Sequence, residues 1–234
     1  MPDPWLILET SGRTGLVGVA VGEAVVAARV LDGAKRHNRD LVPTCAELLA
    51  EGGFTAKQLA GVMVGLGPGS YTGLRVGLMA AKGFAMATGC AVVAVPTFHT
   101  LAAQAPAEWP FVEVIGDALQ GTIYRQRFGG VPANGLRLRL PLGELQIVPF
   151  ADWITARDPE AGVAGPGAEQ FGDRLKGCPV AVTADCHPRV ETVLRVGRTV
   201  APLARPEWFA VEPLYLRGSS AEEKAKRDAS LAAG

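Results

Sequence analysis

Two runs of uninterrupted apolar residues flank a long helical segment, and they restrict the fold more than any other feature. The runs AGVMVGL (60–66) and CAVVAVP (90–96) read as strands, and the segment 67–89 between them opens on glycines and continues as a helix. Strands without polar alternation are typical of a parallel sheet covered by helices on both faces. The sequence therefore predicts an α/β fold.

Three further strands precede this unit. The segments WLILET (5–10), LVGVAV (16–21) and EAVVAARV (23–30) are separated by turn residues, which predicts an antiparallel meander. A helix is predicted within 37–53, capped by Asn38 or Asp40 and ended by Gly52–Gly53. Pro43 is expected near its first turn, where a missing N–H does least harm. One face of this helix carries apolar residues at helical spacing: Leu41, Cys45, Leu48 and Leu49.

A helix at 97–105 closes the first lobe, and the pattern then starts again. The segment FVEVIGDALQGTIYRQRFGG (111–130) repeats the order of apolar strand, acidic residue, glycine turn and returning strand found at the amino terminus. Strands are expected at 145–150 and 180–184, and helices at 168–177 and 188–198. We predict a first lobe at 1–102, a smaller second lobe at 103–218 and a charged, flexible tail at 219–234.

The charge and cysteine content limit the partners and the compartment. With 23 basic and 23 acidic side chains the formal charge is zero, so broad attraction to a nucleic acid or to an anionic membrane is not expected. The four cysteines are scattered without a CxxC pair and are expected to be reduced. No signal peptide and no apolar run of about 18 residues is found. The sequence predicts a soluble cytoplasmic protein.

The glycine-rich segment from Gly67 to Arg75 lies between a predicted strand and a predicted helix. Glycines and free N–H groups at a helix start favour an anion, so a phosphate site is one interpretation. The segment lacks the Lys-Ser/Thr pair of a P-loop and the spacing of a dinucleotide fingerprint. A tight connection from strand to helix is the interpretation that we favour.

Two acidic residues, Glu9 and Asp117, each end the first strand of a lobe and would face the cleft between the lobes. In phosphotransferases, acids at such positions orient water or magnesium near nucleotide phosphates, which favours a kinase or ATPase. The alternative, which we prefer, is that both acids hold the turns that follow them. The residues of a possible nucleotide or phosphate cleft are Glu9, Thr10, Ser11, Gly12, Asp117, Gly67 and Gly69.

The helix that follows Gly67 is poor in charge around its whole circumference. Gly73 and Gly77 lie one turn apart and Ala80–Ala81 continue that side, which predicts a smooth stripe against which another helix could pack closely. Lys82 is the only charged side chain between Arg75 and the end of the helix. We expect a second chain to cover this helix; packing on the chain's own sheet is the alternative.

Four segments resemble one family in order and separation. GPGSYTGLRVGL (67–78) is similar to the GPGSFTGLRIG segment of the TsaB family, and LILETSGRTGLVGVAV (6–21) resembles its first strand-turn-strand unit. KRHNRDLVPTCAELL (35–49) and VEPLYLRGSSAEEK (211–224) resemble its first helix start and its closing segment. The resemblance implies an actin-like ATPase (ASKHA)/RNase H-like fold with two lobes, mixed sheets of the five-stranded type flanked by helices, and a reduced second lobe.

The family resemblance also implies a role without catalysis of its own. TsaB proteins pair with TsaD and the ATPase TsaE to modify adenosine 37 of tRNA with threonylcarbamoyl, and TsaB alone forms homodimers. The resemblance implies that tRNA is contacted only through the complex, that this chain alone binds no cofactor, and that the complex is where ATP or ADP can bind. The residues assigned to the partner surface are Leu41, Cys45, Leu48 and Leu49 on one helix and Tyr71, Leu74, Arg75, Leu78, Met79 and Lys82 on the next.

TsaD binds a metal through an HxxxH motif, and this chain departs from that motif. Thr97 and Leu101 stand where the two histidines would fall, so no metal is expected. His99 lies nearby without a second ligand at helical spacing, and we interpret it as an ordinary packed histidine. Leu119 replaces an arginine that the family has after its second acid. A small-molecule kinase or ATPase and a metallopeptidase-like protein remain the alternative functions.

Overall fold

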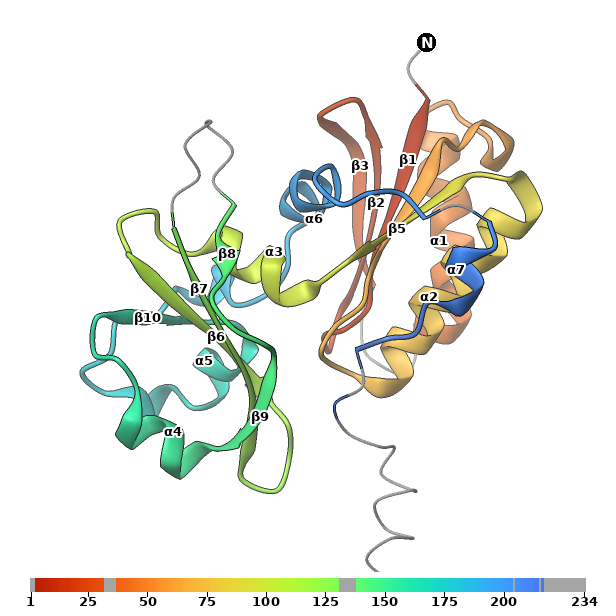
Figure 1. Cartoon of the computed structure of the whole chain (residues 1–234). Helices are drawn as coiled ribbons and strands as arrows, with labels where there is room; N and C mark the ends of the chain where they lie inside the picture. The colour runs from red at the N-terminus through yellow and green to blue at the C-terminus, as the bar shows by residue number, and fades with distance from the viewer. Residues whose placement is uncertain (1–2, 32–36, 131–137, 204, 215, 217–234) are drawn as a thin grey trace, which may run out of the picture.

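The computed structural model describes residues 3–31, 37–130, 138–203, 205–214 and 216, and they form two lobes (Figure 1). The first lobe is built on a five-stranded sheet of order β3-β2-β1-β4-β5. β1, β2 and β3 are antiparallel neighbours, and β4 and β5 continue from β1 in parallel. This confirms the predicted meander and parallel unit. The strands are β1 (Pro4–Glu9), β2 (Gly15–Val21), β3 (Ala24–Leu31), β4 (Gly61–Gly65) and β5 (Ala91–Val95).

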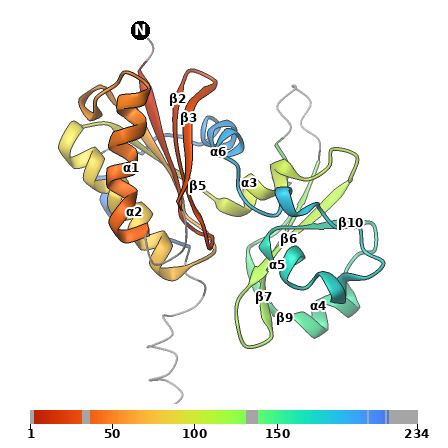
Figure 2. The same ribbon diagram turned by 180° about the vertical axis from the view of Figure 1, so that it is seen from behind.

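Helices cover both faces of this sheet. α1 (His37–Glu51) and α2 (Tyr71–Thr88) pack on one face, and α6 (Val190–Gly197) packs on the other (Figure 2). The central strands are therefore covered on both sides, which explains why β4 and β5 have no polar alternation, whereas alternate residues of the edge strand β3 are exposed. A short 3-10 turn, η1 (Ala56–Gln58), leads into β4.

The sequence predicted the end of α1 correctly but not its start. α1 ends before Gly53, which has φ +78°, as predicted. Its start was placed too late: the helix begins at His37, so Asp40 lies in its first turn and Pro43 lies inside it. In α2 the side chain of Ser70 accepts a hydrogen bond from the N–H of Gly73, and Gly89 with φ +76° ends the helix.

The second lobe repeats most of the strand pairing of the first. β6 pairs with β7 in antiparallel and with β10 in parallel, as β1 pairs with β2 and β4, and no counterpart of β5 is found among the described residues. The reduced second lobe is thereby confirmed. Its strands are β6 (Phe111–Asp117), β7 (Thr122–Gly129), β8 (Leu140–Pro141), β9 (Gln146–Pro149) and β10 (Ala161–Ala164). Its helices are α3 (Thr97–Gln104), α4 (Phe150–Ala156) and α5 (Pro166–Gln170), with 3-10 turns η2 (Gly172–Leu175) and η3 (Thr183–Asp185).

The predicted elements after residue 160 were partly wrong. The helix expected at 168–177 breaks after Gln170, because the chain turns at Phe171 and continues as η2. The strand expected at 180–184 is reduced to a single bridge between Val163 and Val180. The helix expected at 188–198 is confirmed as α6, whereas α4 and α7 (Glu207–Ala210) were not predicted.

The boundary between the lobes also differs from the prediction. The division at residue 102 placed all of 103–218 in the second lobe, but α6 packs on the first sheet through Val190, Val193 and Leu194. Trp208 likewise lies in the core beneath α1 and α2. The chain thus leaves the first lobe after β5 and returns to it near residue 190. The tail expected at 219–234 lies outside the described residues.

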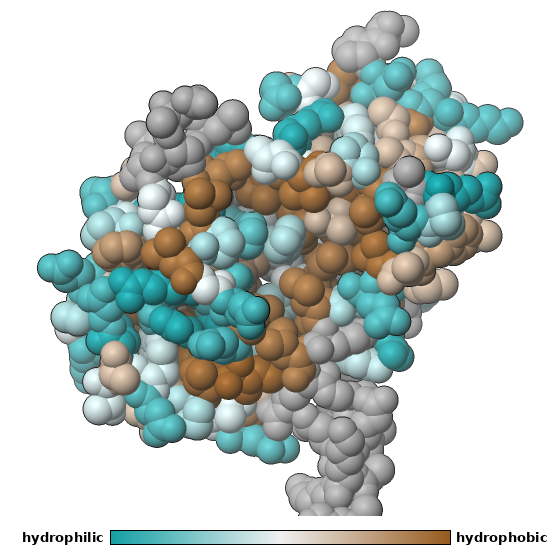
Figure 3. Space-filling view, viewed as in Figure 1, coloured by the Kyte–Doolittle hydropathy of each residue, from teal (hydrophilic) through white to brown (hydrophobic). Residues whose placement is uncertain are grey.

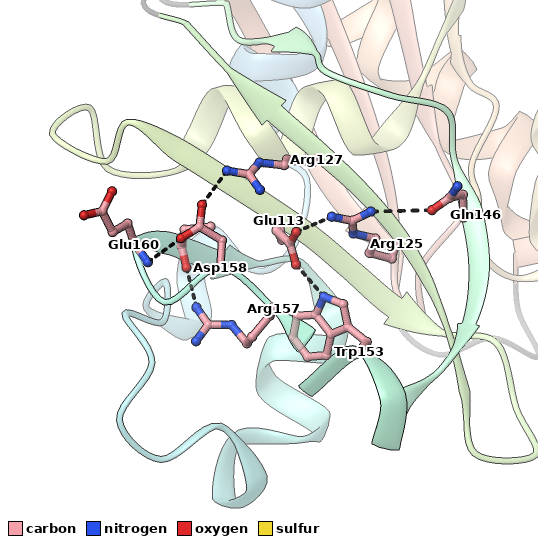
Figure 4. Close-up of polar contacts among 9 residues, drawn as sticks. Glu113, Arg125, Arg127, Gln146, Trp153, Arg157, Asp158 and Glu160 are labelled. Carbon is pink, nitrogen blue, oxygen red and sulfur yellow. Dashed lines mark hydrogen bonds and ion pairs between the residues drawn. The ribbon is translucent and has the colours of Figure 1, made fainter. Parts of the chain in front are cut away.

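A buried glutamate ties three elements of the second lobe together. Glu113 on β6 is 1% exposed and accepts hydrogen bonds from Arg125 on β7 and from the indole N–H of Trp153 on α4 (Figure 4). Nearby, Arg127 forms an ion pair with Asp158 at 2.6 Å. A buried carboxylate is tolerated because both of its oxygens are paired.

Candidate functional site

The carboxylate of Glu9 forms a clasp between three segments at the end of β1. It accepts a hydrogen bond from the N–H of Ser11 at 2.8 Å and another from Oγ1 of Thr97 at 2.9 Å. The same Thr97 hydroxyl accepts the N–H of Gly67 at 3.1 Å. At 2% exposure the carboxylate is enclosed, and a Cβ at Gly65 would lie 2.2 Å from its Oε2. The clasp joins the first turn, the glycine loop and the start of α3.

The glycine loop packs directly on the turn after β1. The N–H of Ser70 donates to Ser11 O at 2.7 Å, and a Cβ at Gly69 would lie 2.3 Å from that same oxygen. Gly67 has φ +89°, and a side chain there would meet Leu74. The N–H groups of residues 67, 70 and 73 are therefore occupied by the chain itself, which agrees with the tight connection favoured above.

Burial raises the pKa of Glu9 above its ordinary value of 4.5, and the hydrogen bonds from Ser11 and Thr97 lower it only in part. A raised pKa means that the folded chain binds the Glu9 proton more tightly than the unfolded chain does. The stabilising contribution is then complete below pH 4.5 and is lost as the pH rises toward the folded pKa. Glu9 and its surroundings hold the turn that follows, as the preferred interpretation predicted.

Replacement of Glu9 by glutamine should remove this pH dependence. We expect the free energy of unfolding of wild type, relative to Glu9→Gln, to fall as the pH rises above 4.5, because only the carboxyl group ionises. Urea unfolding at several values between pH 4 and 7 measures the difference. Glu144→Gln, at an exposed position, is the control. Parallel curves for wild type and Glu9→Gln would contradict the assignment.

Asp117 also holds its own turn. Its Oδ1 accepts the N–H of Leu119 at 2.7 Å and its Oδ2 accepts a hydrogen bond from Gln170 at 2.9 Å. Both donors belong to the second lobe, so these bonds do not bring Asp117 to the Glu9 clasp. Leu119, which replaces the arginine discussed above, is 56% exposed at φ +66°. Gly12 lies in the turn after Ser11 and is partly exposed.

The hollow between the lobes is largely apolar on the face shown in Figure 3. The expectation that Glu9 would face an open cleft is wrong, because the Glu9 carboxylate is buried against Gly65. A separate cavity of about 500 Å³ lies between α6 and the end of α3 with the segment that follows it. Sequence reasoning did not identify it, because residues from two distant segments form it. Its polar lining residues are Gln104, Arg189, Glu191, Thr192 and Arg195.

The positions of the HxxxH histidines lie inside the molecule. Thr97 is 1% exposed and hydrogen-bonds to Glu9. Leu101 is 1% exposed and lies in the hydrophobic core of the second lobe. The ring of His99 meets Phe128 edge-on at 5.2 Å between centroids, and burial lowers its pKa. Among the described residues no group of three or more His, Cys, Asp or Glu side chains could hold a metal ion.

Two further predictions concern the oxidation state of the cysteines and the absence of a membrane-spanning helix. Cys45, Cys90, Cys178 and Cys186 are all free of disulfides, as expected, and burial raises the pKa of Cys45 to about 12. Within the described ranges no helix is both long and apolar enough to span a membrane.

Six of the ten residues assigned to the partner surface are buried within this chain. At 4% exposure or less they pack on the sheet, so a partner could not contact their side chains; they are Leu41, Cys45, Leu48, Leu49, Leu74 and Leu78. The smooth stripe is also internal: a Cβ at Gly73 would lie 2.0 Å from Thr10 O, and one at Gly77 would lie 2.3 Å from Thr10 Oγ1. The glycines let α2 approach β1, which was the alternative interpretation.

The outer sides of α1 and α2 carry a different set of apolar residues. Met79 is 67% exposed and Met86, which sequence reasoning missed, is 59% exposed. On α1, Val42 is 52% exposed. Tyr71 and Arg75 lie at the start of α2, where the guanidinium stacks 4.1 Å from the ring centroid. Small exposed residues separate the larger apolar ones: Ala46, Ala50, Gly83 and Ala87.

Comparison with protein families shows that both α1 and α2 lie within a known type of domain. The family model described as TsaD, tRNA N6-adenosine threonylcarbamoyltransferase, matches residues 31–147, which is half of the chain. A tRNA N6-adenosine threonylcarbamoyltransferase of Streptococcus pneumoniae is 39% identical over 87 residues, which are 35% of this chain and 26% of that protein.

Two further relatives cover more of the chain. The tRNA threonylcarbamoyladenosine biosynthesis protein TsaB of Bacillus subtilis is 30% identical over 149 residues. That match includes 64% of this chain and spans 63% of the length of the Bacillus protein. YeaZ from Pseudomonas aeruginosa superposes with a TM-score of 0.73 at 22% identity, covering 92% of this chain and 100% of that one. The superposition shows that this chain shares the two-lobed α/β fold of YeaZ.

Proposed function

The chain belongs to the TsaB (YeaZ) family of tRNA threonylcarbamoyladenosine biosynthesis, and we propose that it serves there as a non-catalytic scaffold that binds TsaD. Its task is to hold TsaD in an active arrangement and to support binding of TsaE. Alone, it forms a homodimer through the same surface. The transfer of threonylcarbamoyl to tRNA then belongs to TsaD, and this chain contacts tRNA only through the complex.

The exposed apolar side of α1 and α2 is the observation that carries this proposal. Met79, Met86 and Val42 are each more than half exposed, although burying such side chains stabilises a protein by about 1.5–3 kcal/mol each. Large apolar side chains exposed on two neighbouring helices are typical of an interaction site. The alanines and Gly83 between these residues leave room for a partner helix to approach.

The chemistry of the described residues supports a scaffold more than an enzyme. The oxygens of Glu9 and Asp117 accept hydrogen bonds that hold neighbouring turns, and Thr97 and Leu101 stand in place of metal-binding histidines. TsaD is a suitable partner because the TsaD family model matches the segment that contains all of α1 and α2. Two related lobes can pair through equivalent helices about an approximate two-fold axis, as two copies of this chain can.

A double charge substitution on α2 tests the surface. Met79→Glu with Met86→Glu should weaken TsaD binding on the order of 30-fold, because about 2 kcal/mol is lost when central apolar contacts are replaced by desolvated charge. Calorimetry measures the affinity, and size-exclusion chromatography reports the homodimer. Val182→Glu is the matched control, because Val182 is 66% exposed but lies in the second lobe. Equal affinity of both variants would contradict this surface.

The scaffold role itself is tested by activity. Purified TsaD and TsaE with tRNA and the threonylcarbamoyl donor should transfer the group slowly alone and faster when this chain is added. The Met79→Glu/Met86→Glu variant should lose the stimulation. Transfer that proceeds equally with and without the chain would refute the role.

A further inference from the structure

The last described segment folds back across the outside of the first lobe. It begins at Leu203, whose N–H donates to Val92 O at 2.8 Å, and ends at Leu214, whose N–H donates to Leu66 O at 3.0 Å. We call residues 203 and 205–214 the C-terminal strap. Between its two ends lies α7, which runs beside α2 (Figure 1). The strap is thus fixed at both ends to the backbone of the first lobe.

Trp208 is the apolar anchor of the strap. It is 3% exposed and lies in the core that α1 and α2 share with the sheet. Phe209 stacks on Trp208 at 3.9 Å between centroids but is itself 46% exposed. The strap therefore buries one aromatic ring and presents the next one outward.

Lys82 is the polar anchor. Its Nζ donates to the carbonyl oxygens of Phe209 and Val211, both at 2.8 Å. Lys82 follows Met79 by three positions and precedes Met86 by four, so the three side chains lie on neighbouring turns of one side of α2. The strap is consequently attached to α2 between the two exposed methionines.

We infer that the strap and the outer side of α2 form one composite docking surface for TsaD, with Lys82 as the positioning residue. The inference rests on the proposed function. It adds the C-terminal strap to the TsaD-binding surface that α1 and α2 form. The apolar side chains of this composite surface are Met79, Met86, Phe209 and Leu214, each 39% exposed or more. Lys82 contributes by holding the strap carbonyls, not by touching the partner.

We commit to TsaD as the occupant because the composite surface, which includes the strap, suits TsaD better than a second copy of this chain. The TsaD family model ends at residue 147, so the strap lies outside the part that the two proteins share. In a two-fold homodimer each copy would bring a strap with a protruding Phe209 to the joint. In the pair with TsaD this chain brings its strap only once.

Lys82→Met tests the inference, because methionine keeps the apolar stem but cannot donate to the two carbonyls. Amide hydrogen exchange in residues 205–214 should become at least about tenfold faster, and affinity for TsaD should fall about tenfold, since two hydrogen bonds from a charged group are lost. The Lys82→Met variant should still fold, because Trp208 continues to anchor the strap in the core, and circular dichroism checks this. Lys82→Arg should restore both properties, and Lys57→Met, at an exposed lysine elsewhere on the lobe, should change neither.

Phe209→Ser is the second variant. It should leave exchange in the strap slow while weakening TsaD binding. If Lys82→Met frees the strap but binds TsaD as wild type does, the composite surface is wrong; if strap exchange is unchanged, the role of Lys82 is wrong. Weaker self-association with unchanged TsaD binding would assign the surface to a second copy. Wild type that fails to bind TsaD at all would overturn the proposed function instead.

Discussion

Gly73→Ala should destabilise the protein by about 3 kcal/mol, because the added Cβ would lie 2.0 Å from the carbonyl oxygen of Thr10. Neither side can yield easily. The oxygen belongs to backbone, and the Thr10 hydroxyl donates to Gly73 O at 2.7 Å, which fixes α2 against the end of β1. Denaturation by urea, followed by circular dichroism, measures the loss.

The same helix supplies a matched control. Gly83 is exposed on α2, and no atom lies within 4 Å of a Cβ built there. Gly83→Ala should therefore stabilise the protein by about 0.5–1 kcal/mol, since alanine costs less backbone entropy in a helix than glycine does. Opposite signs for the two substitutions are the expected result. A Gly73→Ala variant as stable as Gly83→Ala would show that α2 does not press on the first turn.

Glu113→Ala should destabilise the second lobe by about 3 kcal/mol. The Glu113 carboxylate is almost completely buried (Figure 4). Its removal leaves the buried indole N–H of Trp153 without an acceptor and the guanidinium of Arg125 without its ion-pair partner. Removing one partner of a buried charged group leaves the other desolvated and unpaired, which costs more than an exposed ion pair contributes. Thermal and urea unfolding measure the effect.

Two companion variants separate charge from hydrogen bonding. Glu113→Gln keeps an acceptor for Trp153 and should cost about half as much as Glu113→Ala. Glu160→Ala, at an exposed position in the same lobe, should change stability by less than about 0.5 kcal/mol. If Glu113→Ala were as mild as Glu160→Ala, the buried cluster would not hold β6, β7 and α4 together.

The first lobe could be predicted closely because its signals are local. The apolar runs of β4 and β5, the turn glycines and the helical spacing of Leu41, Cys45 and Leu48 each report the conformation of their own segment. The second lobe was predicted less well beyond residue 160. Its elements there are short, and α5 with η2 breaks within a stretch whose pattern suits one helix.

The candidate site shows where local patterns stop being informative. Sequence spacing identified the two helices as a surface, but it could not distinguish which side of each helix the sheet covers. Gly73 and Gly77 suggested an external stripe, whereas they face Thr10 inside the lobe. The sequence did not indicate that Met86 and Phe209 are exposed, because a single apolar residue can occur in the core or on the surface.

The sequence by itself determined the α/β class, the meander, the duplicated hairpin and the family, because these depend on residues adjacent along the chain or on ordered motifs. Only the tertiary structure decided that α6 and the C-terminal strap return to the first lobe, that Glu9 is closed off by Gly65, and that Lys82 holds the strap. These contacts join residues more than 50 positions apart. Their formation depends on which surfaces meet when the chain folds, and no local pattern encodes that choice.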